Sequence, residues 1–331
     1  MISLVLIQIT IKIEKKHIIY PLLAMPVIAL LVFYRAKLAI TFSDPQIFID
    51  KIVEATGLLG NSFAIIGQYF LIVVGCFLLE ITILGWESSS VYRMTYRRDK
   101  SIIGDITCWF LALFGVYDFI AFVSTFGLFY LLAGVIQSNL YLGFGELIKS
   151  EELLFVLIFI LSDFKNYIDH YVNHHISSLW AVHMYHHSAT SLNFITSYRF
   201  HFLSKGISMI FNASFFALIG APPDIFAEIY LITMIWRILL HGNIKVNIGW
   251  LGRNVFVTPQ LHKIHHSSEE RHFNKNFGAI FIFWDRMLGT YHAEEEVREV
   301  GIENGPYNKR GFIYDMYIGF KMFIMNLTSS K

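Results

Sequence analysis

The sequence predicts an all-α, multi-pass membrane helical bundle with a cytoplasmic histidine-rich helical cap. Two observations predict this class. Only 15% of the 331 residues are charged, against about 25% in soluble domains, while 55% are hydrophobic and the mean hydropathy is +0.53. A water-soluble fold would therefore expose too much apolar surface. The second observation is that 12 of the 14 histidines fall between His170 and His272.

Several apolar runs approach the roughly 20 residues that a helical membrane crossing requires. They lie at about 18–34, 62–86, 106–136 and 152–164. Two shorter runs, 206–220 and 225–240, flank Ala221-Pro222-Pro223-Asp224, which is a turn signal. These two runs are expected to form a helical hairpin that dips into the membrane, and whether the hairpin crosses fully is left open.

Basic residues in the segment 88–100 predict the orientation of the bundle. Arg93, Arg97, Arg98 and Lys100 place this segment on the cytoplasmic side by the positive-inside rule. If the run 106–136 crosses outward once and the run 152–164 returns, the histidine region begins in the cytoplasm. The hairpin leaves and re-enters the same face, so all the histidine clusters are expected on one side.

Three regions are expected along one integrated domain. They are an N-terminal transmembrane region (1–150), a catalytic region (151–292) and a C-terminal interfacial tail (293–331). A removable signal peptide is not expected, because Lys12, Lys15 and Lys16 follow the first apolar residues without a small-residue cleavage site. A net charge of +1 without a long basic block argues against nucleic-acid binding.

The histidines form three clusters with helical spacing. The first is His170 and His174, the second is His183, His186 and His187, and the third is His262, His265 and His266. Positions i, i+3 and i+4 share one face of an α-helix, so each cluster can direct two or three imidazoles at a common point. The two cysteines, Cys76 and Cys108, lie in apolar runs and offer no cysteine-based metal site.

This pattern indicates metal binding. A random chain of this composition would contain His-x-x-His-His about 0.025 times, whereas this chain contains it twice, at 183–187 and 262–266. Buried structural histidines are the alternative, but each unpaired buried nitrogen would cost roughly 1–3 kcal/mol. Eight imidazoles exceed the four to six ligands of one ion, so two metals are expected. Imidazole suits zinc, copper, iron or nickel, so the ligand type does not choose the metal.

Other residues are candidates for supporting positions. His241, at the predicted return of the hairpin, is expected to be a further ligand, with a helix-end anchor as the alternative, and His201 is a candidate extra ligand. His175 would point about 100° away from His174 on a helix and is expected in a supporting or surface position. His17, His272 and His292 lack the spacing. Asp163 and Asp285 are candidates to accept the second N–H of a ligating imidazole, and Glu80 is a weaker one.

The residues from about 163 to 292 resemble the fatty acid hydroxylase and sterol desaturase superfamily of integral-membrane di-iron oxygenases. The resemblance is carried by 179–188 (LWAVHMYHHS), 199–201 (RFH), 241–243 (HGN), 258–266 (TPQLHKIHH), 276–278 (NFG) and 284–290 (WDRMLGT). Two departures concern the substrate branch: Tyr171 stands where the family often has Arg, and Phe202-Leu203-Ser204 stands where it often has Pro-Leu-Glu.

The resemblance implies two iron ions, O2 as co-substrate, and hydroxylation or desaturation of a lipid such as a sterol, alkylglycerol, fatty acyl chain or sphingoid base. Electrons would come from a separate carrier of the ferredoxin or cytochrome b5 type. The basic residues from Arg93 to Lys100 offer a docking surface for such a carrier, although topology alone also explains them. The membrane would be the bacterial inner membrane or the endoplasmic reticulum.

Three other classes of protein bind metal or haem through histidine. A membrane zinc hydrolase would be expected to contain His-Glu-x-x-His, which is absent. A metal carrier or transporter would distribute its ligands along a path through the spans, whereas these histidines are expected at one face. A bis-histidine haem protein would use only two to four of them.

Overall fold

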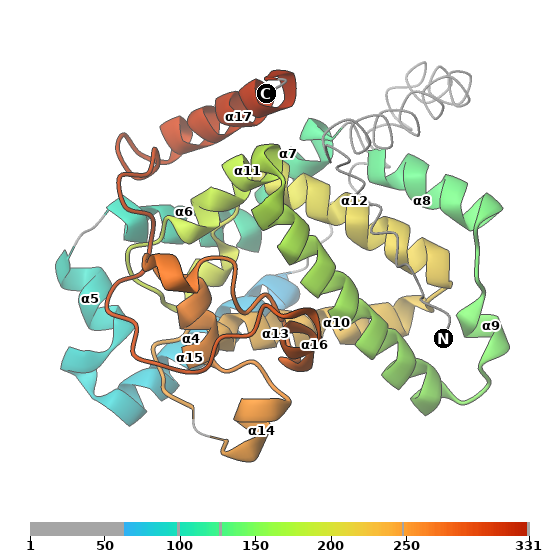
Figure 1. Ribbon diagram of the computed structural model, residues 1–331, viewed down its shortest axis with the longest axis horizontal. Helices are drawn as coiled ribbons and strands as arrows, with labels where there is room; N and C mark the ends of the chain where they lie inside the picture. Colours follow the sequence, from blue (N-terminus) through green and yellow to red (C-terminus); the bar gives the residue numbers. More distant parts are fainter. Residues whose placement is uncertain (1–62, 98–99, 126–127, 247, 330–331) are drawn as a thin grey trace, which may run out of the picture. The chain divides into compact units, whose positions relative to one another are not determined.

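The computed structural model describes residues 63–97, 100–125, 128–246 and 248–329, and in these ranges all the regular structure is helical (Figure 1). The all-α prediction is confirmed for this part of the chain. Two isolated antiparallel bridges, Phe256–Phe281 and Ser267–Val300, join loop segments. The α-helices are α4 (Phe63–Leu84), α5 (Ser90–Arg97), α6 (Lys100–Leu113), α7 (Val116–Ser124), α8 (Leu128–Asn139), α9 (Phe144–Leu147), α10 (Glu151–His175), α11 (Ser177–His187), α12 (Phe202–Ile219), α13 (Pro223–Leu240), α14 (Trp250–Asn254), α15 (Pro259–His265), α16 (Phe283–Leu288) and α17 (Phe312–Thr328).

The predicted membrane runs correspond to helices of different lengths. The run 18–34 lies outside the described residues, the run 62–86 becomes α4, and the run 152–164 becomes the first half of the 25-residue α10. Among the described helices, α12 is long and apolar enough to cross a membrane by length and composition, and α4 contains a shorter apolar stretch, Phe70–Leu84. The multi-pass topology and its cytoplasmic side therefore stay predictions.

The run 106–136 does not form one continuous helix, and its single outward crossing stays a prediction. The structure divides this run among α6, α7 and α8. The backbone turns at Gly115, which has φ +68°, a left-handed conformation that glycine adopts without a Cβ clash. Helices α7 and α8 then pack along α12. Close approach is possible because a Cβ on Gly206 would lie only 2.5 Å from Cγ2 of Thr125.

Helices α12 and α13 are joined at the predicted turn, but along their length they pack against other helices rather than against each other. Gly220 ends α12 with φ +67°, Pro222 is the N-cap of α13, and Pro223 is its first residue, where proline is well tolerated. Helix α10 packs against α11, α12 and α13 (Figure 1). An apolar cluster around Ile158, Ile219 and Ile229 joins α10, α12 and α13. These helices form the framework that carries most of the histidines.

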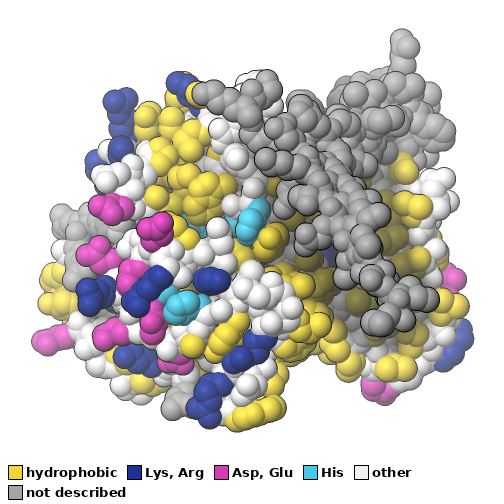
Figure 2. All heavy atoms as spheres, in the orientation of Figure 1, with side chains coloured by type: hydrophobic (Ala, Val, Ile, Leu, Met, Phe, Trp, Pro, Cys, Tyr) yellow, Lys and Arg dark blue, Asp and Glu magenta, His cyan; other side chains and the backbone are white. Residues whose placement is uncertain are grey.

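Helix α17 packs against α11 at the other side of the framework. Met316 and Tyr307 contact Tyr185 of α11 in one apolar cluster. The opposite face of α17 leaves large apolar side chains exposed, among them Ile313 (78%) and Tyr317 (56%). Figure 2 shows hydrophobic side chains over the part of the surface where α17 lies.

Candidate metal centre

Four helices bring the predicted histidines together. His170 and His174 lie one turn apart on α10, and His183, His186 and His187 occupy the last turns of α11. His241 caps the C-terminus of α13, while His262 and His265 lie on α15 and His266 caps it. Helix α15 begins with a regular cap, in which the Thr258 hydroxyl accepts a hydrogen bond from the Leu261 amide at 3.3 Å. Helical spacing thus directs each set of imidazoles inward.

The nine histidines separate into two groups. In each group the candidate ligand nitrogens lie within 4.8 Å of one another. The five-histidine group is His170, His174, His183, His187 and His265, and the four-histidine group is His186, His241, His262 and His266. The groups adjoin, because the His187 and His266 rings stack with centroids 4.4 Å apart. Two groups of several nitrogens each are compatible with two centres, and the number of metal ions stays a prediction.

Backbone carbonyls fix the orientation of four of these rings. Nδ1 of His186 bonds the Arg199 oxygen at 3.2 Å, and Nδ1 of His241 bonds the Arg237 oxygen at 2.7 Å. Nδ1 of His170 and Nδ1 of His265 bond the backbone oxygens of residues 277 and 275 at 3.0 and 2.8 Å. A carbonyl accepts only from N–H, so Nδ1 carries the proton and Nε2 keeps its lone pair. The lone pairs are therefore available for a metal.

One contact between ring nitrogens is unfavourable without a cation. Nε2 of His241 lies 3.2 Å from Nε2 of His186 and 3.1 Å from Nε2 of His262. His186 and His241 both carry their proton on Nδ1, so the first contact brings two lone pairs together. Two acceptors facing each other in a buried site repel, whereas a metal ion would bind both.

Several further nitrogens in the groups have no hydrogen-bond partner among the described residues. They are Nε2 of His183, Nδ1 of His262, Nε2 of His265 and both ring nitrogens of His266. Burial, together with the neighbouring histidines, lowers the pKa of His183, His187 and His266 well below the ordinary value. The rings are therefore neutral at physiological pH, which is the form that coordinates a metal. The donor set fits two imidazole-bound metal ions.

The two predicted carboxylates support the groups indirectly. Asp285 accepts hydrogen bonds from the amides of Phe277 (2.7 Å) and Gly278 (2.8 Å), and so holds the loop whose Phe277 oxygen bonds His170. Asp163 accepts from the amides of Ile280 and Phe281 and from Nε1 of Trp284. Neither carboxylate has a hydrogen bond to a histidine of the groups among the described residues. Asp163 of α10 thus holds the segment 280–284, and Asp285 of α16 holds residues 277 and 278.

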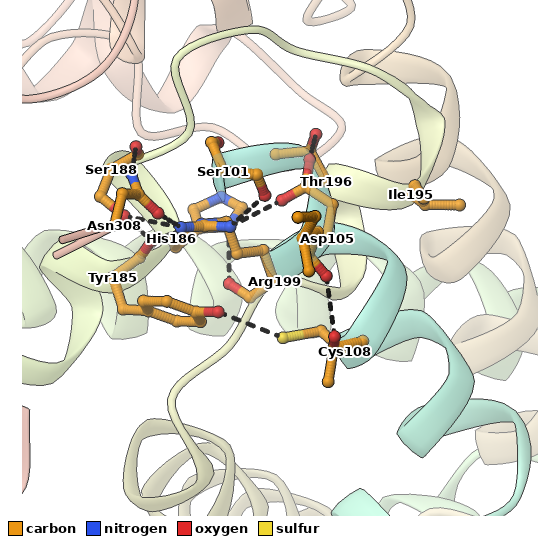
Figure 3. A network of polar contacts seen from close by, with 12 residues as sticks. Ser101, Asp105, Cys108, Tyr185, His186, Ser188, Ile195, Thr196, Arg199 and Asn308 are labelled. Atoms are coloured by element: carbon orange, nitrogen blue, oxygen red, sulfur yellow. Dashed lines mark hydrogen bonds and ion pairs between the residues drawn. The ribbon is translucent and has the colours of Figure 1, made fainter. Parts of the chain in front are cut away.

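A buried arginine ties α6 to the end of α11 (Figure 3). The Arg199 guanidinium pairs with Asp105 at 2.9 Å, and neither side chain is exposed. The same guanidinium donates to the Tyr185 oxygen at 2.9 Å and to the Ser188 hydroxyl at 3.0 Å. This network fixes the backbone on both sides of His186. The Arg-Phe-His motif contains Arg199, but nothing in the motif reveals this role of its guanidinium.

Three other candidates lie outside both groups. Nε2 of His201 bonds the Met316 oxygen at 2.8 Å, and Nδ1 of His201 accepts from the Leu203 amide at 3.2 Å, so the structure does not bring this candidate extra ligand to the metal centre. His175 stacks on Tyr171 and bonds its backbone oxygen. Glu80 is buried and accepts from the Ser90 hydroxyl at 2.8 Å.

A third group was not expected from spacing. Candidate ligand atoms of His272, His292 and Glu295 lie within 4.8 Å of one another. His272 hydrogen-bonds Glu295, and Arg271 pairs with the same carboxylate at 3.1 Å. No periodicity joins these residues, because the loop between α15 and α16 and the segment after α16 bring them together.

A cavity of about 150 Å³ adjoins both histidine groups. Its walls include His170 and His183 of the five-histidine group and His186, His241 and His262 of the four-histidine group. A small part of a substrate can therefore lie directly beside the candidate ligands.

A helical framework carrying two adjoining polyhistidine groups is typical of proteins with a histidine-rich metal site. Residues 155–290 match the family model described as fatty acid hydroxylase, and this range contains all nine histidines. The resemblance to the fatty acid hydroxylase and sterol desaturase superfamily is thus confirmed, and this region is a fatty acid hydroxylase domain.

The relatives that match part of this chain are named as lipid-modifying enzymes. An ornithine lipid hydroxylase OlsE from Rhizobium tropici is 35% identical over 137 residues, which are 41% of each chain. An alkylglycerol monooxygenase from Caenorhabditis elegans is 33% identical over 143 residues, which are 43% of this chain and 27% of the relative. A Delta(7)-sterol 5(6)-desaturase from Gibberella zeae is 25% identical over 138 residues, which are 42% of this chain and 41% of the relative. The chain thus spans less than half of each of these relatives, and no solved structure matches it.

Proposed function

We propose that this chain is a membrane-bound di-iron oxygenase that uses O2 and external electrons to hydroxylate a lipid. The observation that carries the proposal is the pair of adjoining histidine groups in which lone pairs of His186 and His241 face each other at 3.2 Å. Hydroxylation is favoured over desaturation because the relatives with 30% identity or more are named as a hydroxylase and monooxygenases. The desaturase relative is only 25% identical.

In this proposal the five-histidine group would hold one iron and the four-histidine group the other. When bound, the irons supply the oxidising power that, with O2 and two electrons, attacks an unactivated C–H bond. The balanced reaction converts the lipid C–H, O2, two electrons and two protons into a C–OH group and water. The electrons would come from a separate carrier of the ferredoxin or cytochrome b5 type.

The chain's own residues have positioning and binding roles. Carbonyl oxygens of Arg199, Arg237, Lys275 and Phe277 hold Nδ1–H of four imidazoles and so direct Nε2 of each toward its group. The cavity beside His170 and His186 gives the reacting part of the lipid a place close to both groups. Exposed apolar side chains on α4, α10, α13 and α17 fit contact with a bilayer, from which the lipid would enter.

Two measurements test the proposal. Metal analysis of the purified chain should give about two irons, from the two groups, and no haem absorbance. Cells expressing the chain under ¹⁸O2 should contain a lipid with one labelled oxygen atom that is missing from cells expressing the His186→Ala variant. The variant must be present in the membrane fraction at a level similar to the unmodified chain.

Other outcomes point to other classes. One zinc ion per chain with hydrolase activity would favour a membrane zinc hydrolase, and bound metal without any labelled lipid would favour a metal-binding protein. A labelled product made equally well by His186→Ala would contradict the assignment of this histidine as a ligand.

A further inference from the structure

Several charged and amide side chains line the cavity beside the histidine groups, although apolar atoms make up most of its wall. Helix α10 contributes Asn166, Asp169 and Asn173, helix α12 contributes Ser208 and Asn212, and helix α13 contributes Arg237. A second cavity of about 110 Å³ shares seven lining residues with the first, Asn166, Asn212 and Arg237 among them. Charged and amide side chains buried among such helices are costly and usually mark a binding site.

Most polar groups in these walls are satisfied by each other. Asp169 accepts from Nδ2 of Asn173 at 3.0 Å and from the Ser208 hydroxyl at 3.1 Å. Lys205 pairs with Asp118 at 3.3 Å. Lys165, which lines the second cavity, donates to the Asn212 side-chain oxygen. Their own partners thus account for these contacts without any ligand.

Arg237 is the exception. Its half-buried guanidinium forms no hydrogen bond or ion pair with any described residue, although it lines both cavities. Arg237 also lies one helical turn before His241, whose ring it holds through its backbone oxygen. The arginine is therefore fixed close to the metal centre, with its charged end free for a ligand.

An alkyl chain could pack against the apolar part of the wall, but it would leave Arg237 without a partner. It would displace water from the guanidinium and the amides without replacing the lost hydrogen bonds. An oxyanion would match, because a carboxylate or phosphate accepts two parallel hydrogen bonds from one guanidinium. The Lys165 ammonium in the adjoining cavity adds positive charge, part of which the Asp169 carboxylate of the first cavity offsets.

We propose that these cavities bind the acidic headgroup of a lipid, with its carboxylate or phosphate on Arg237 and Lys165 nearby. This inference rests on the proposed function and narrows its substrate. The headgroup end of the lipid, rather than the far end of an acyl chain, then lies beside the histidines. The C–H bonds near the acidic group are the ones expected to react.

Lipid retention tests this inference without O2 or electrons. The full chain is purified in a neutral detergent, freed of lipid, and mixed with equal amounts of phosphatidic acid, an N-acylglycine and diacylglycerol with matched acyl chains. Native mass spectrometry then measures the bound fraction of each. The two acidic lipids should be retained over diacylglycerol by about tenfold or more, as charge-assisted bidentate contacts imply.

Variants assign the preference to the guanidinium. Arg237→Gln should reduce the preference for acidic lipids to near unity, and Arg237→Lys should keep part of it. Arg253→Gln removes an exposed arginine of α14 outside both cavities and should behave like the unmodified chain. An unchanged preference in Arg237→Gln, or equal retention of all three lipids, would overturn the inference.

Two further measurements are needed. The first distinguishes binding of a lipid headgroup from binding of a free anion, and the second tests headgroup binding separately from the di-iron proposal. Inorganic phosphate at millimolar concentration should compete only weakly; strong competition would mean that the cavities take a free anion rather than a lipid. Iron content is measured on the same samples. About two irons per chain without any headgroup preference would contradict headgroup binding but not the di-iron proposal. A clear headgroup preference without iron would contradict the di-iron proposal but not headgroup binding.

Discussion

The backbone oxygen of Arg199 accepts a hydrogen bond from Nδ1 of His186 at 3.2 Å, while the guanidinium of the same Arg199 is buried in an ion pair with Asp105. One residue thus joins a buried charge network to the orientation of a candidate ligand. Because the carbonyl holds the Nδ1 proton, Nε2 of His186 faces the four-histidine group. Through Arg199, the stability of the contact between α6 and α11 is therefore coupled to the geometry of the metal centre.

The Arg199→Met variant should be strongly destabilised. It leaves the Asp105 carboxylate buried without its cation, and breaking a buried pair in this way costs about 3–5 kcal/mol. Thermal unfolding of the purified chain in detergent measures the loss. Arg253→Met is the matched control, because Arg253 is exposed. An Arg199→Met chain that melts at the same temperature as the control would show that the ion pair is not important.

A glycine beside the same network provides a second test. A Cβ on Gly104 would lie 2.5 Å from Nη1 of Arg199, whereas a Cβ on Gly75 of α4 would meet nothing within 4 Å. We expect Gly104→Ala to lower the free energy of unfolding by about 1–3 kcal/mol through overpacking. Gly75→Ala should be neutral or slightly stabilising because it improves helix propensity. Equal melting temperatures for the two variants would contradict the tight packing.

Removing one histidine should affect the two groups differently. His262→Ala leaves three ligands in the four-histidine group, whereas His174→Ala leaves four in the other. We therefore expect His262→Ala to lose about one metal ion per chain and His174→Ala to retain more of its metal. Metal analysis after identical purification gives the comparison. His175→Gln, outside both groups, should keep the full content; if it loses as much metal as His262→Ala, the grouping is wrong.

The Asp285→Asn variant should weaken the five-histidine group without removing a ligand. Asp285 holds the Phe277 and Gly278 amides, and the Phe277 oxygen orients His170. Loss of such outer contacts lowers metal affinity by roughly 10–100-fold. Competition with a chelator of known affinity measures the change. Asp224→Asn, at the start of α13 and away from the centre, is the control, and equal affinities in the two variants would exclude this positioning role.

The metal-free protein should become less stable as the pH falls from about 6.5 towards 4. Burial lowers the pKa of His241 and that of His201 from 6.5 to about 4. In this window the unfolded chain binds protons that the folded chain does not, so the stabilisation is complete above pH 6.5 and is lost on acidification. Melting temperatures of the chelator-treated chain across this range test the sign. His201→Gln should reduce the pH dependence, and a melting temperature independent of pH would contradict the prediction.

The helices and candidate ligands followed largely from sequence periodicity. Spacing of i, i+3 and i+4 identified His183, His186 and His187 because an α-helix places such positions on neighbouring faces. The turn between α12 and α13 followed from the prolines at 222–223. The division of the run 106–136 into three helices could not be predicted from the sequence. Local hydrophobicity does not reveal a left-handed glycine at 115 or the packing of α7 and α8 on α12.

The sequence by itself predicted an apolar chain, the helices of its described part and the imidazoles that are candidate metal ligands. Only the tertiary structure decided how these imidazoles divide between the five-histidine group and the four-histidine group. His186 and His187 are adjacent in the chain, yet they belong to different groups, because successive side chains on a helix diverge by about 100°. The tertiary structure also decided the surroundings of Arg237. The sequence shows that residue 237 is an arginine, but its guanidinium lacks a partner among the described residues because of the way α10, α12 and α13 pack around it.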